Sequence, residues 1–244
     1  MKIGFIIQAR MSSTRLPNKM AMPFGKEASL LGHIIDRLQI NFESYIISVA
    51  TSTNSLDDKI DGICGEYNIP CIRGSEKDVA SRFIQAAEDL DIDYVIRVCG
   101  DNPFLSMELT RNIIKRCEDD TNKSDYYSYY VNNKVGILTD HGFFCEIFSI
   151  KRLQKEWELM DSYMKEHVTP IFYTKNDMLI SKLPYDNHKM KGVRLTIDTI
   201  EDYNLCREVF DILRGKKQDI DGIIDILRPC HYEIMKDKSK NNIK

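Results

Sequence analysis

The sequence has no long hydrophobic run. The apolar segment near its N-terminus, Ile3–Ile7, is short, and Arg10 follows it closely. A membrane-spanning helix needs about 20 predominantly apolar residues, and the core of a secretory signal needs about 7–15. We therefore expect neither a membrane span nor a secretory signal, and we expect the protein to act in the cytoplasm.

Paired cysteines are also missing. The chain has 7 cysteines, which is an odd number, and no two of them form a CxxC pair. Disulfide frameworks and zinc knuckles both need regularly spaced cysteines. The sequence thus predicts reduced and mostly buried thiols.

An excess of positive charge is absent as well. The 34 Lys and Arg residues face 37 Asp and Glu residues, which gives a net charge of −3 and argues against a nucleic-acid partner. The distribution is more informative, because every charged side chain before Glu27 is a cation. These cations are Lys2, Arg10, Arg15, Lys19 and Lys26. A basic segment on an acidic body suits one small polyanion such as a nucleoside triphosphate.

Short apolar runs alternate with amphipathic stretches over the first half of the chain. We predict strands over 2–7, 45–50, 69–72 and 94–98, and helices near 30–38, 57–67, 79–90 and 109–117. This order predicts an α/β fold with a parallel sheet and helices on both faces. A length of 244 residues fits one such domain, spanning 1–244. Ligands of these sheets bind beyond the carboxyl ends of the strands.

The pattern changes at about Asp125, where tyrosines and phenylalanines crowd together. We interpret residues 125–190 as an aromatic excursion inserted before a last sheet strand over 193–197 and a closing helix over 201–213. Aromatic residues are enriched at protein interfaces, so the excursion is the expected surface of a homodimer. The lysine-rich tail, 236–244, is expected to be frayed.

The loop that follows the first strand is rich in cations and hydroxyl groups. It carries Arg10, Arg15 and Lys19 around the run Ser12–Thr14. Backbone amides and hydroxyls at such a position can cradle phosphate oxygens, while arginine and lysine neutralise the charge. A solvated surface loop is the alternative, but the place of the loop after the first strand favours a phosphate site.

Two aspartates follow predicted strands and could share a ligand. Asp101 comes after the strand over 94–98, and Asp198 after the strand over 193–197. Two carboxylates together with phosphate oxygens and water are suitable ligands for Mg²⁺. The alternative is a helix-capping role, especially for Asp198. Another acidic pair, Asp91 and Asp93, precedes a strand, so we expect it at the wrong end of the sheet and solvated.

Several motifs in order resemble one enzyme family. Residues 7–19, IQARMSSTRLPNK, are similar to the signature loop xARxxSxRLPGK of the CMP-sugar synthetases, and most closely to their SpsF-like branch. The later matches are ATS at 50–52, RGSEKDVASRF at 73–83, RVCGDNPF at 97–104, KEHVTP at 165–170 and RLTIDTIEDY at 194–203. The resemblance implies a GT-A-like nucleotidyltransferase fold and a Mg²⁺-dependent cytidylyltransferase. Such an enzyme couples CTP to an acidic sugar, releases pyrophosphate for surface polysaccharide synthesis, and is commonly a homodimer.

The resemblance also implies roles for individual residues. CTP is expected to contact Ala9, Arg10, Ser12, Arg15, Lys19, Thr51, Ser52, Arg73, Gly74, Ser75 and Asp101. The expected catalytic residues are Arg10, Lys19, Asp101 and Asp198, with the two aspartates holding Mg²⁺. The expected acceptor-binding residues are His141, Glu146, His167 and Arg194. His167 could serve as a general base or as a structural hydrogen-bond donor. Arg82 could pair with Asp78 one helical turn away or turn toward the nucleotide.

Two positions depart from the family pattern. Asn18 stands where the family has glycine, and asparagine is among the residues that best tolerate a positive φ. Phe144 stands where the family commonly has aspartate, which leaves the acceptor open. Two alternatives therefore stay in view, namely a glycosyltransferase that consumes a nucleotide sugar and a nucleotide-binding protein without turnover.

Overall fold

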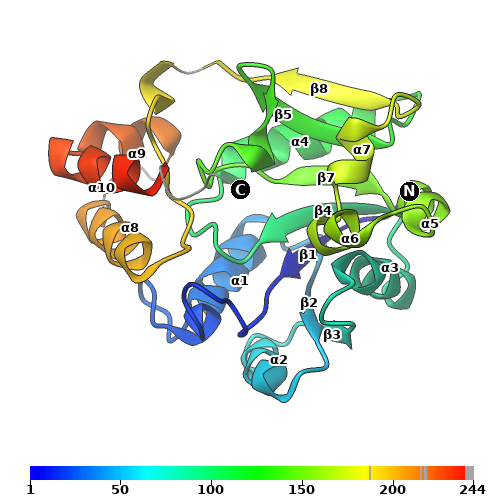
Figure 1. Cartoon of the computed structure of the whole chain (residues 1–244), viewed down its shortest axis with the longest axis horizontal. Helices are drawn as coiled ribbons and strands as arrows, with labels where there is room; N and C mark the ends of the chain where they lie inside the picture. The colour runs from blue at the N-terminus through cyan, green and yellow to red at the C-terminus, as the bar shows by residue number, and fades with distance from the viewer. Residues whose placement is uncertain (187, 215, 217–218, 240–244) are drawn as a thin grey trace.

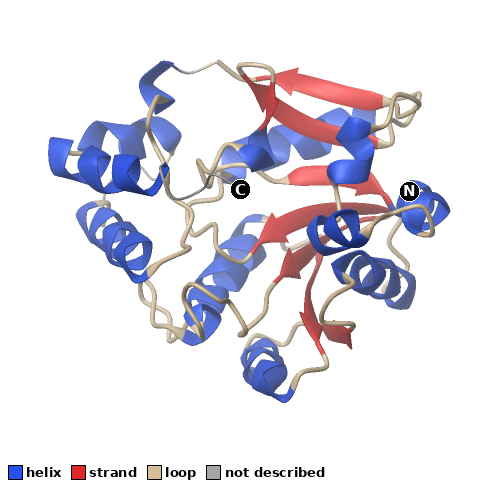
Figure 2. Ribbon diagram, in the orientation of Figure 1, coloured by secondary structure: helices blue, strands red, loops and turns tan. Residues whose placement is uncertain are grey.

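A single sheet with helices on both faces organises the protein (Figures 1 and 2). The computed structural model describes residues 1–186, 188–214, 216 and 219–239. The strands are β1 (Ile3–Gln8), β2 (Ile46–Ser52), β3 (Cys71–Gly74), β4 (Tyr94–Cys99), β5 (Tyr126–Val131), β6 (Lys134–Val135), β7 (Glu146–Ser149) and β8 (Ile180–Pro184). Their order is β3-β2-β1-β4-β7-β5-β6, and β8 pairs with β5.

The first half of the sheet is parallel, as the sequence predicts. β1 lies between β2 and β4, with Gln8 opposite Ala50 on one side and Cys99 on the other. Successive residues of β1 enter different cores, because strand side chains alternate between the two faces. Phe5 and Ile7 belong to one apolar cluster, and Ile6 belongs to the other. The carboxyl ends of the four strands therefore meet at one edge, where the loops of interest begin.

The helices cover both faces (Figure 1). They are α1 (Leu30–Asn41), α2 (Asp58–Glu66), α3 (Val79–Asp89), α4 (Met107–Asp119), α5 (Ile150–Trp157), α6 (Ser162–His167), α7 (Pro170–Thr174), α8 (Ile200–Ile212), α9 (Ile220–Ile226) and α10 (Pro229–Ser239). Apolar residues of α1, α2, α4, α8 and α9 pack on the face that contains Phe5, and those of α3, α5 and α7 pack on the opposite face. No helix among the described residues is long and apolar enough to cross a membrane.

Polar side chains fix where several of these helices begin. Ser29, Asp78, Ser106 and Thr199 each accept a hydrogen bond from a backbone N–H in the first turn of the following helix. Such N-caps satisfy donors that the helix itself leaves free. At Thr199 the cap is reciprocal, because Asp202 accepts from the backbone N–H of Thr199. These caps place the loops before α3, α4 and α8 at the carboxyl edge of the sheet.

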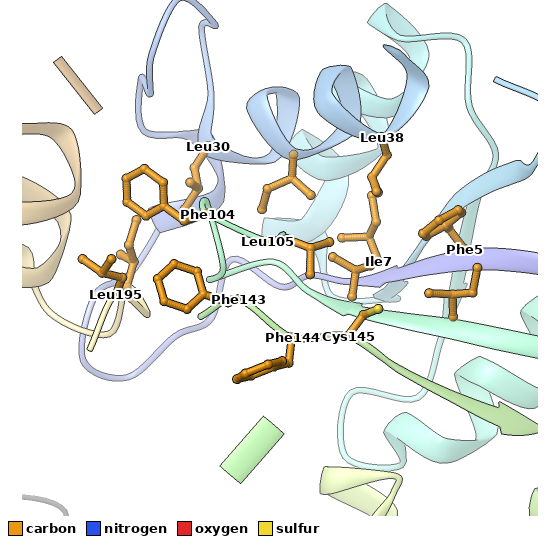
Figure 3. Close-up of a cluster of buried hydrophobic side chains, with 14 of the residues drawn as sticks. Phe5, Ile7, Leu30, Leu38, Phe104, Leu105, Phe143, Phe144, Cys145 and Leu195 are labelled. Carbon is orange, nitrogen blue, oxygen red and sulfur yellow. The ribbon is translucent and has the colours of Figure 1, made fainter. Parts of the chain in front are cut away.

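The aromatic segment differs from the prediction. Residues 125–190 are no excursion from the sheet, since they supply β5, β6, β7 and β8, and β7 runs antiparallel between β4 and β5. Its clustered aromatic side chains are core residues rather than an open surface. The buried ones are Tyr126, Tyr127, Tyr129, Phe143, Phe144 and Phe148. In Figure 3, Phe143 lies beside Phe104 and Leu195, whereas Phe144 lies on the other side of the backbone.

The prediction of a last sheet strand over 193–197 is wrong. Val193, Leu195 and Ile197 are buried, so the alternation of side chains in the sequence is real. The segment is nevertheless outside every strand of the described sheet, because its backbone bonds go to two separate loops. Leu195 donates to the carbonyl of Asp140 and Ile197 to that of Asp101. Of the predicted frayed tail, 236–239 belong to α10, and 240–244 lie outside the described residues.

Candidate active site

The loop after β1 is a closed turn. Asn18 has a φ of 62° and donates its backbone N–H to the carbonyl of Met11 at 3.0 Å. Ala21 in turn donates to the carbonyl of Asn18, which begins the short helix η1 (Lys19–Ala21). Asparagine tolerates this left-handed conformation well. The departure from the family glycine therefore leaves the turn intact and brings Lys19 toward the sheet.

A buried carboxylate fastens this loop to the next strand. Asp57 is fully buried in η2 (Ser55–Asp57) and accepts the backbone N–H of Met11 at 2.7 Å. It also accepts the backbone N–H of Ser52 at 3.1 Å and the hydroxyl of the same residue. Hydrogen bonds to an ionised acceptor are stronger than neutral ones. Asp57 thus fixes the first loop relative to the end of β2, a role that the sequence reasoning missed.

Two carboxylates and three cations meet at the carboxyl edge of the sheet. The Lys19 ammonium lies 3.4 Å from Asp101 Oδ2 and 4.0 Å from Asp198 Oδ1, and it donates to the carbonyl of Ile197 at 2.6 Å. Asp198 also accepts from Arg15 Nη2 at 2.8 Å and from Arg194 Nη2 at 2.9 Å. The structure therefore brings together the basic loop and both predicted aspartates. We call the pair Asp101 and Asp198 the carboxylate junction.

Charges of both signs meet at the carboxylate junction. Burial and the facing carboxylate of Asp101 raise the pKa of Asp198, while Lys19, Arg15 and Arg194 oppose that rise. A positive charge bound beside Asp198 would favour its ionised form. Among the described residues no cluster of three or more metal-ligating side chains is found. A divalent cation at the junction would thus take its other oxygen ligands from phosphate and water.

Two adjoining cavities share this junction. One has a volume of about 250 Å³ and is lined by the loop after β1. We call it the phosphate-side cavity. The other has a volume of about 280 Å³ and is lined by residues of η3 (Gly136–Leu138), α6 and α7, together with Phe144. We call it the acceptor-side cavity. The residues that line both are Arg15, Cys99, Asp101, His167 and Asp198.

Most of the residues predicted to bind phosphate line one cavity. Ala9, Arg10, Arg15, Lys19 and Asp101 line the phosphate-side cavity. Ser12 is the exception in this loop, because its hydroxyl donates to Glu76 at 3.1 Å. Its neighbours Ser13 and Thr14 line the cavity instead.

The predicted base-binding residues hold the loops rather than line the two cavities. Arg73 donates to the carbonyls of Ser52 and Asn54 and pairs with Asp58 at 2.7 Å. The Ser52 hydroxyl donates to Asp57, and Thr51 is fully buried beside it in β2. Gly74 and Ser75 follow on β3 and its loop.

Arg82 is buried behind the Gly74–Ser75 turn. Its guanidinium donates to the carbonyl of Ser75 at 3.1 Å, and an added Cβ at Gly74 would come within 2.9 Å of the Arg82 side chain. Asp78 instead caps α3 and accepts from the indole of Trp157. The i,i+4 pair with Asp78 is absent from the ion pairs of the described residues. Arg82 lies under the turn and lines neither cavity, so a contact with the nucleotide stays a prediction.

The four residues predicted to bind the acceptor lie in different places. His167 lines both cavities, and burial lowers the pKa of its ring while Glu166 opposes this. His141 points away, because its Nδ1 lies 2.8 Å from the carbonyl of Val193. Arg194 bonds Asp198 rather than lining the acceptor-side cavity. Glu146 is fully buried beneath the cavity floor.

Glu146 belongs to a buried polar network that the sequence reasoning missed. Arg97 lines the acceptor-side cavity and donates to Glu146 at 2.6 Å, to Thr169 at 3.3 Å and to Gln8 at 2.8 Å. The hydroxyls of Thr169 and Tyr126 also donate to Glu146. Every partner is satisfied, as a buried ion pair requires. A lone arginine within the apolar strand β4 was the sequence signal for this network.

The fold and the site define a class of enzyme. A mixed sheet whose parallel half presents a basic loop after its first strand, with two carboxylates between two cavities beyond the strand ends, fits an α/β enzyme that binds a phosphorylated ligand. The acidic pair Asp91 and Asp93 lies outside this site, as predicted, where both carboxylates contact Lys2.

Comparison with known proteins identifies the family within this class. The cytidylyltransferase family model matches residues 4–233. The spore coat polysaccharide biosynthesis protein SpsF of Bacillus subtilis is 32% identical over 226 residues, which cover 89% of this chain and 90% of SpsF. The uncharacterized protein MJ1063 of Methanocaldococcus jannaschii is 36% identical over 233 residues, which cover 93% of this chain and 90% of MJ1063. A cytidylyltransferase structure from Leptospira borgpetersenii has a TM-score of 0.79 at 27% identity. The match covers 98% of this chain and 96% of that structure. The chain belongs to the cytidylyltransferase family and is a CTP-dependent nucleotidyltransferase.

Proposed function

We propose that the enzyme transfers CMP from CTP to an acidic sugar or a related anionic acceptor. An acceptor oxygen attacks the α-phosphorus, the bond from that phosphorus to the bridging oxygen breaks, and pyrophosphate leaves. The acceptor gives up its proton in the same exchange. The observation that supports this proposal is the meeting of the two cavities at Asp101 and Asp198, because two substrates bound there would lie on either side of one pair of carboxylates.

Each element of the site has a physical role in this proposal. Arg10, Arg15 and Lys19 would hold the triphosphate, since guanidinium and ammonium groups neutralise phosphate oxygens. Asp101 and Asp198 would hold Mg²⁺, which supplies charge neutralisation at the phosphate when bound. Before CTP arrives, these cations are paired within the protein, Arg10 with Glu166 and Arg15 with Asp198. CTP binding therefore exchanges protein partners for phosphate oxygens.

His167 is the residue best placed to meet the acceptor from the end of α6. Burial lowers the pKa of its imidazole, so the ring is neutral near pH 7 and can accept a proton. It packs on Tyr163, which also lines the acceptor-side cavity, with 4.4 Å between the ring centroids. We propose that His167 contacts the acceptor, and that Asp140 and Arg97 complete the polar surroundings.

The test is pyrophosphate release with matched nucleotides. The protein is incubated with Mg²⁺, a panel of nonulosonic and aldulosonic acids, and either CTP, UTP, ATP or GTP. We expect pyrophosphate with CTP, and a product whose mass equals the acceptor plus CMP less water. A glycosyltransferase would instead consume a CMP-sugar without releasing pyrophosphate. A binding protein would retain CTP and give no product with any acid.

We also propose the biological setting. The similarity to SpsF, a spore coat polysaccharide biosynthesis protein, supports a role in surface polysaccharide synthesis. The seven cysteines are all free thiols, which fits a reducing cytoplasm. A homodimer is proposed through exposed apolar side chains of the 125–190 segment, such as Leu159 and Leu179, since its clustered aromatics are buried. A monomeric mass by light scattering at micromolar concentration would remove the dimer.

A further inference from the structure

The chain reverses abruptly at Val168, between α6 and α7 (Figure 1). Val168 has a φ of 68° and a ψ of −60°, and the amide of Thr169 donates to the carbonyl of His167 at 2.8 Å. These angles and this bond between residues two apart define a γ-turn with a positive φ, which is its rare and strained form. A β-branched residue in this conformation is an outlier, because its Cβ crowds the backbone.

The backbone next to Val168 is unusual as well. Thr169 has a φ of −94° and a ψ of −6°, in the sparsely populated bridge region. Pro170 follows it, and a proline ring disfavours a helical conformation of the residue before it. The other non-glycine residues with a positive φ in the described chain are asparagine, aspartate or lysine. Two adjacent unfavourable conformations, one of them at a valine, point to a functional constraint, since such residues cluster at active sites.

The side chain of Val168 anchors the turn. It is fully buried in the apolar cluster that also contains Ile171 and Phe172 of α7. The Val168 amide donates to the carbonyl of Met164 at 2.7 Å, and the carbonyl of Thr169 accepts from the amide of Phe172 at 3.0 Å. Strained backbone persists where its surroundings determine it, and burial of the isopropyl group offsets the cost. Glycine would adopt the same φ with less strain but would lose this anchor.

The helix before the turn has few other attachments to the core. None of the residues of α6 is buried, although Met164 packs partly against the same apolar cluster. Lys165 and Glu166 form ion pairs of 3.8 and 3.5 Å with partly exposed side chains of other loops. Ion pairs of this kind contribute little to stability. Val168 therefore fastens the carboxyl end of α6.

The residues on either side of Val168 face the candidate site. His167 lines both cavities, and Thr169 lines the acceptor-side cavity. The Thr169 hydroxyl is fixed, because it donates to Glu146 at 3.0 Å and accepts from Arg97 at 3.3 Å. The His167 ring, by contrast, has no hydrogen bond within the described part of the chain. Its place thus depends on the backbone at the end of α6, which the turn fixes.

We propose that Val168 is a positioning residue for nucleotidyl transfer, whose γ-turn holds the His167 ring at the edge that the two cavities share. Val168 itself lines neither cavity, so it acts through its neighbour. This inference rests on the proposed function, because it takes His167 as the residue that meets the acceptor. A displacement of about 1 Å at such a group can lower the rate by about 100-fold.

A double-mutant cycle tests whether Val168 acts through His167. We measure pyrophosphate release with CTP, Mg²⁺ and the most reactive acid of the nonulosonic and aldulosonic panel. Val168→Gly should lower kcat/KM for the acid about 10- to 100-fold, while the calorimetric Kd of CTP stays within about 2-fold. In the His167→Gln background, Val168→Gly should cost less than about 2-fold, because the group that it positions is gone.

Three variants keep this test decisive. Val168→Ile retains a β-branched, apolar side chain and should keep at least about a third of the wild-type kcat/KM. Leu153→Ala removes a fully buried side chain of α5 from the same cluster, and it should lower stability but change kcat/KM less than about 2-fold. Val168→Ala takes the place of Val168→Gly where the glycine variant does not fold, with a loss in the same direction.

Amide hydrogen exchange of the free protein reports the turn without any substrate. The Thr169 amide should exchange about 10-fold or more faster in Val168→Gly than in the wild type, because local opening sets its protection. Unchanged exchange overturns the inference. A loss of kcat/KM that is equally large in the His167→Gln background, or in Leu153→Ala, overturns it as well.

The two readouts separate this inference from the proposed function. If the wild type releases no pyrophosphate with any acid, the proposed function fails, and the exchange rates still decide whether Val168 holds the end of α6. If pyrophosphate is released and Val168→Gly retains the wild-type kcat/KM, the proposed function stands and this inference fails. If no acid reacts and the exchange of the Thr169 amide is unchanged, both are overturned.

Discussion

Replacing Asp57 with asparagine tests how the first loop is held. Its carboxylate accepts three hydrogen bonds, from the Met11 amide and from the amide and hydroxyl of Ser52. The asparagine side chain would keep one oxygen for Met11 but would turn an N–H₂ group toward the amide of Ser52. Two donors would then face each other in a fully buried site. The negative charge that favours the buried Arg82 guanidinium would also be lost.

The expected cost follows from these contacts. A hydrogen bond to a charged group contributes about 1.5–3 kcal/mol, and leaving a buried donor without a partner costs about 1–3 kcal/mol. One bond is retained and the Ser52 hydroxyl can reverse its role, so we expect a loss of about 2–4 kcal/mol in the free energy of unfolding. The loosened loop should also bind CTP more weakly, because it carries the cations of the phosphate-side cavity.

Urea denaturation and calorimetric CTP titration measure the two effects of Asp57→Asn. The matched control is Asp89→Asn, at an exposed aspartate at the end of α3, which should change stability by no more than about 0.5 kcal/mol. A stability within about 0.5 kcal/mol of the wild type together with an unchanged Kd for CTP would refute the reasoning.

Three further changes follow from the buried and charged groups. Burial lowers the pKa of His33 to about 4. The free energy of unfolding should therefore fall by at most about 3 kcal/mol as the pH drops from 6.5 toward 4. His33→Gln should remove that share of the pH dependence in urea denaturation. Glu146→Gln leaves the buried Arg97 without its counter-charge and should cost about 3–5 kcal/mol by thermal denaturation. Glu166→Gln frees Arg10 from a half-exposed ion pair and should lower KM for CTP about 2- to 5-fold.

Each of these has a result that contradicts it. Between pH 6.5 and 4 only the unfolded state binds a proton at His33, so acid lowers the free energy of unfolding. If this free energy fell with pH in His33→Gln just as it does in the wild type, His33 would not be the cause. For Glu146→Gln the control is Glu158→Gln, an exposed glutamate, and equal melting temperatures for the two would count against the buried pair. An unchanged or higher KM in Glu166→Gln would show that the Arg10 pair does not compete with CTP.

The parts of the fold governed by local pattern could be predicted from the sequence. The strands β1 to β4 and helices α1 to α4 have apolar periods that reflect two-sided or one-sided burial, and these periods are visible without tertiary information. The segment 193–197 shows the limit of this reasoning. Alternating burial predicts an extended backbone, but whether that backbone joins a sheet depends on which distant groups its N–H donors reach.

The candidate site likewise contains some contacts that the sequence could predict and others that it could not. Lys19 and Asp101 could be placed together because each follows a strand at one edge of the sheet. Asp198 was grouped with them through a strand over 193–197 that the described sheet does not contain. The Asp57–Met11 and Arg97–Glu146 contacts could not be predicted, since each joins residues more than 40 positions apart whose meeting depends on the tertiary packing of loops and antiparallel strands. Arg97 was at least visible as a charge in an apolar strand, which requires a buried partner.

The central claim is that CMP transfer takes place at the carboxylate junction. The most direct measurement is the rate of pyrophosphate release from CTP, with Mg²⁺ and a reactive acidic sugar, by the wild type and by Asp101→Asn. The account predicts that Asp101→Asn loses about 100-fold or more of the rate, as removal of one charge-stabilising group typically does, while CTP still binds through the loop after β1. An Asp101→Asn enzyme that releases pyrophosphate at the wild-type rate would contradict it.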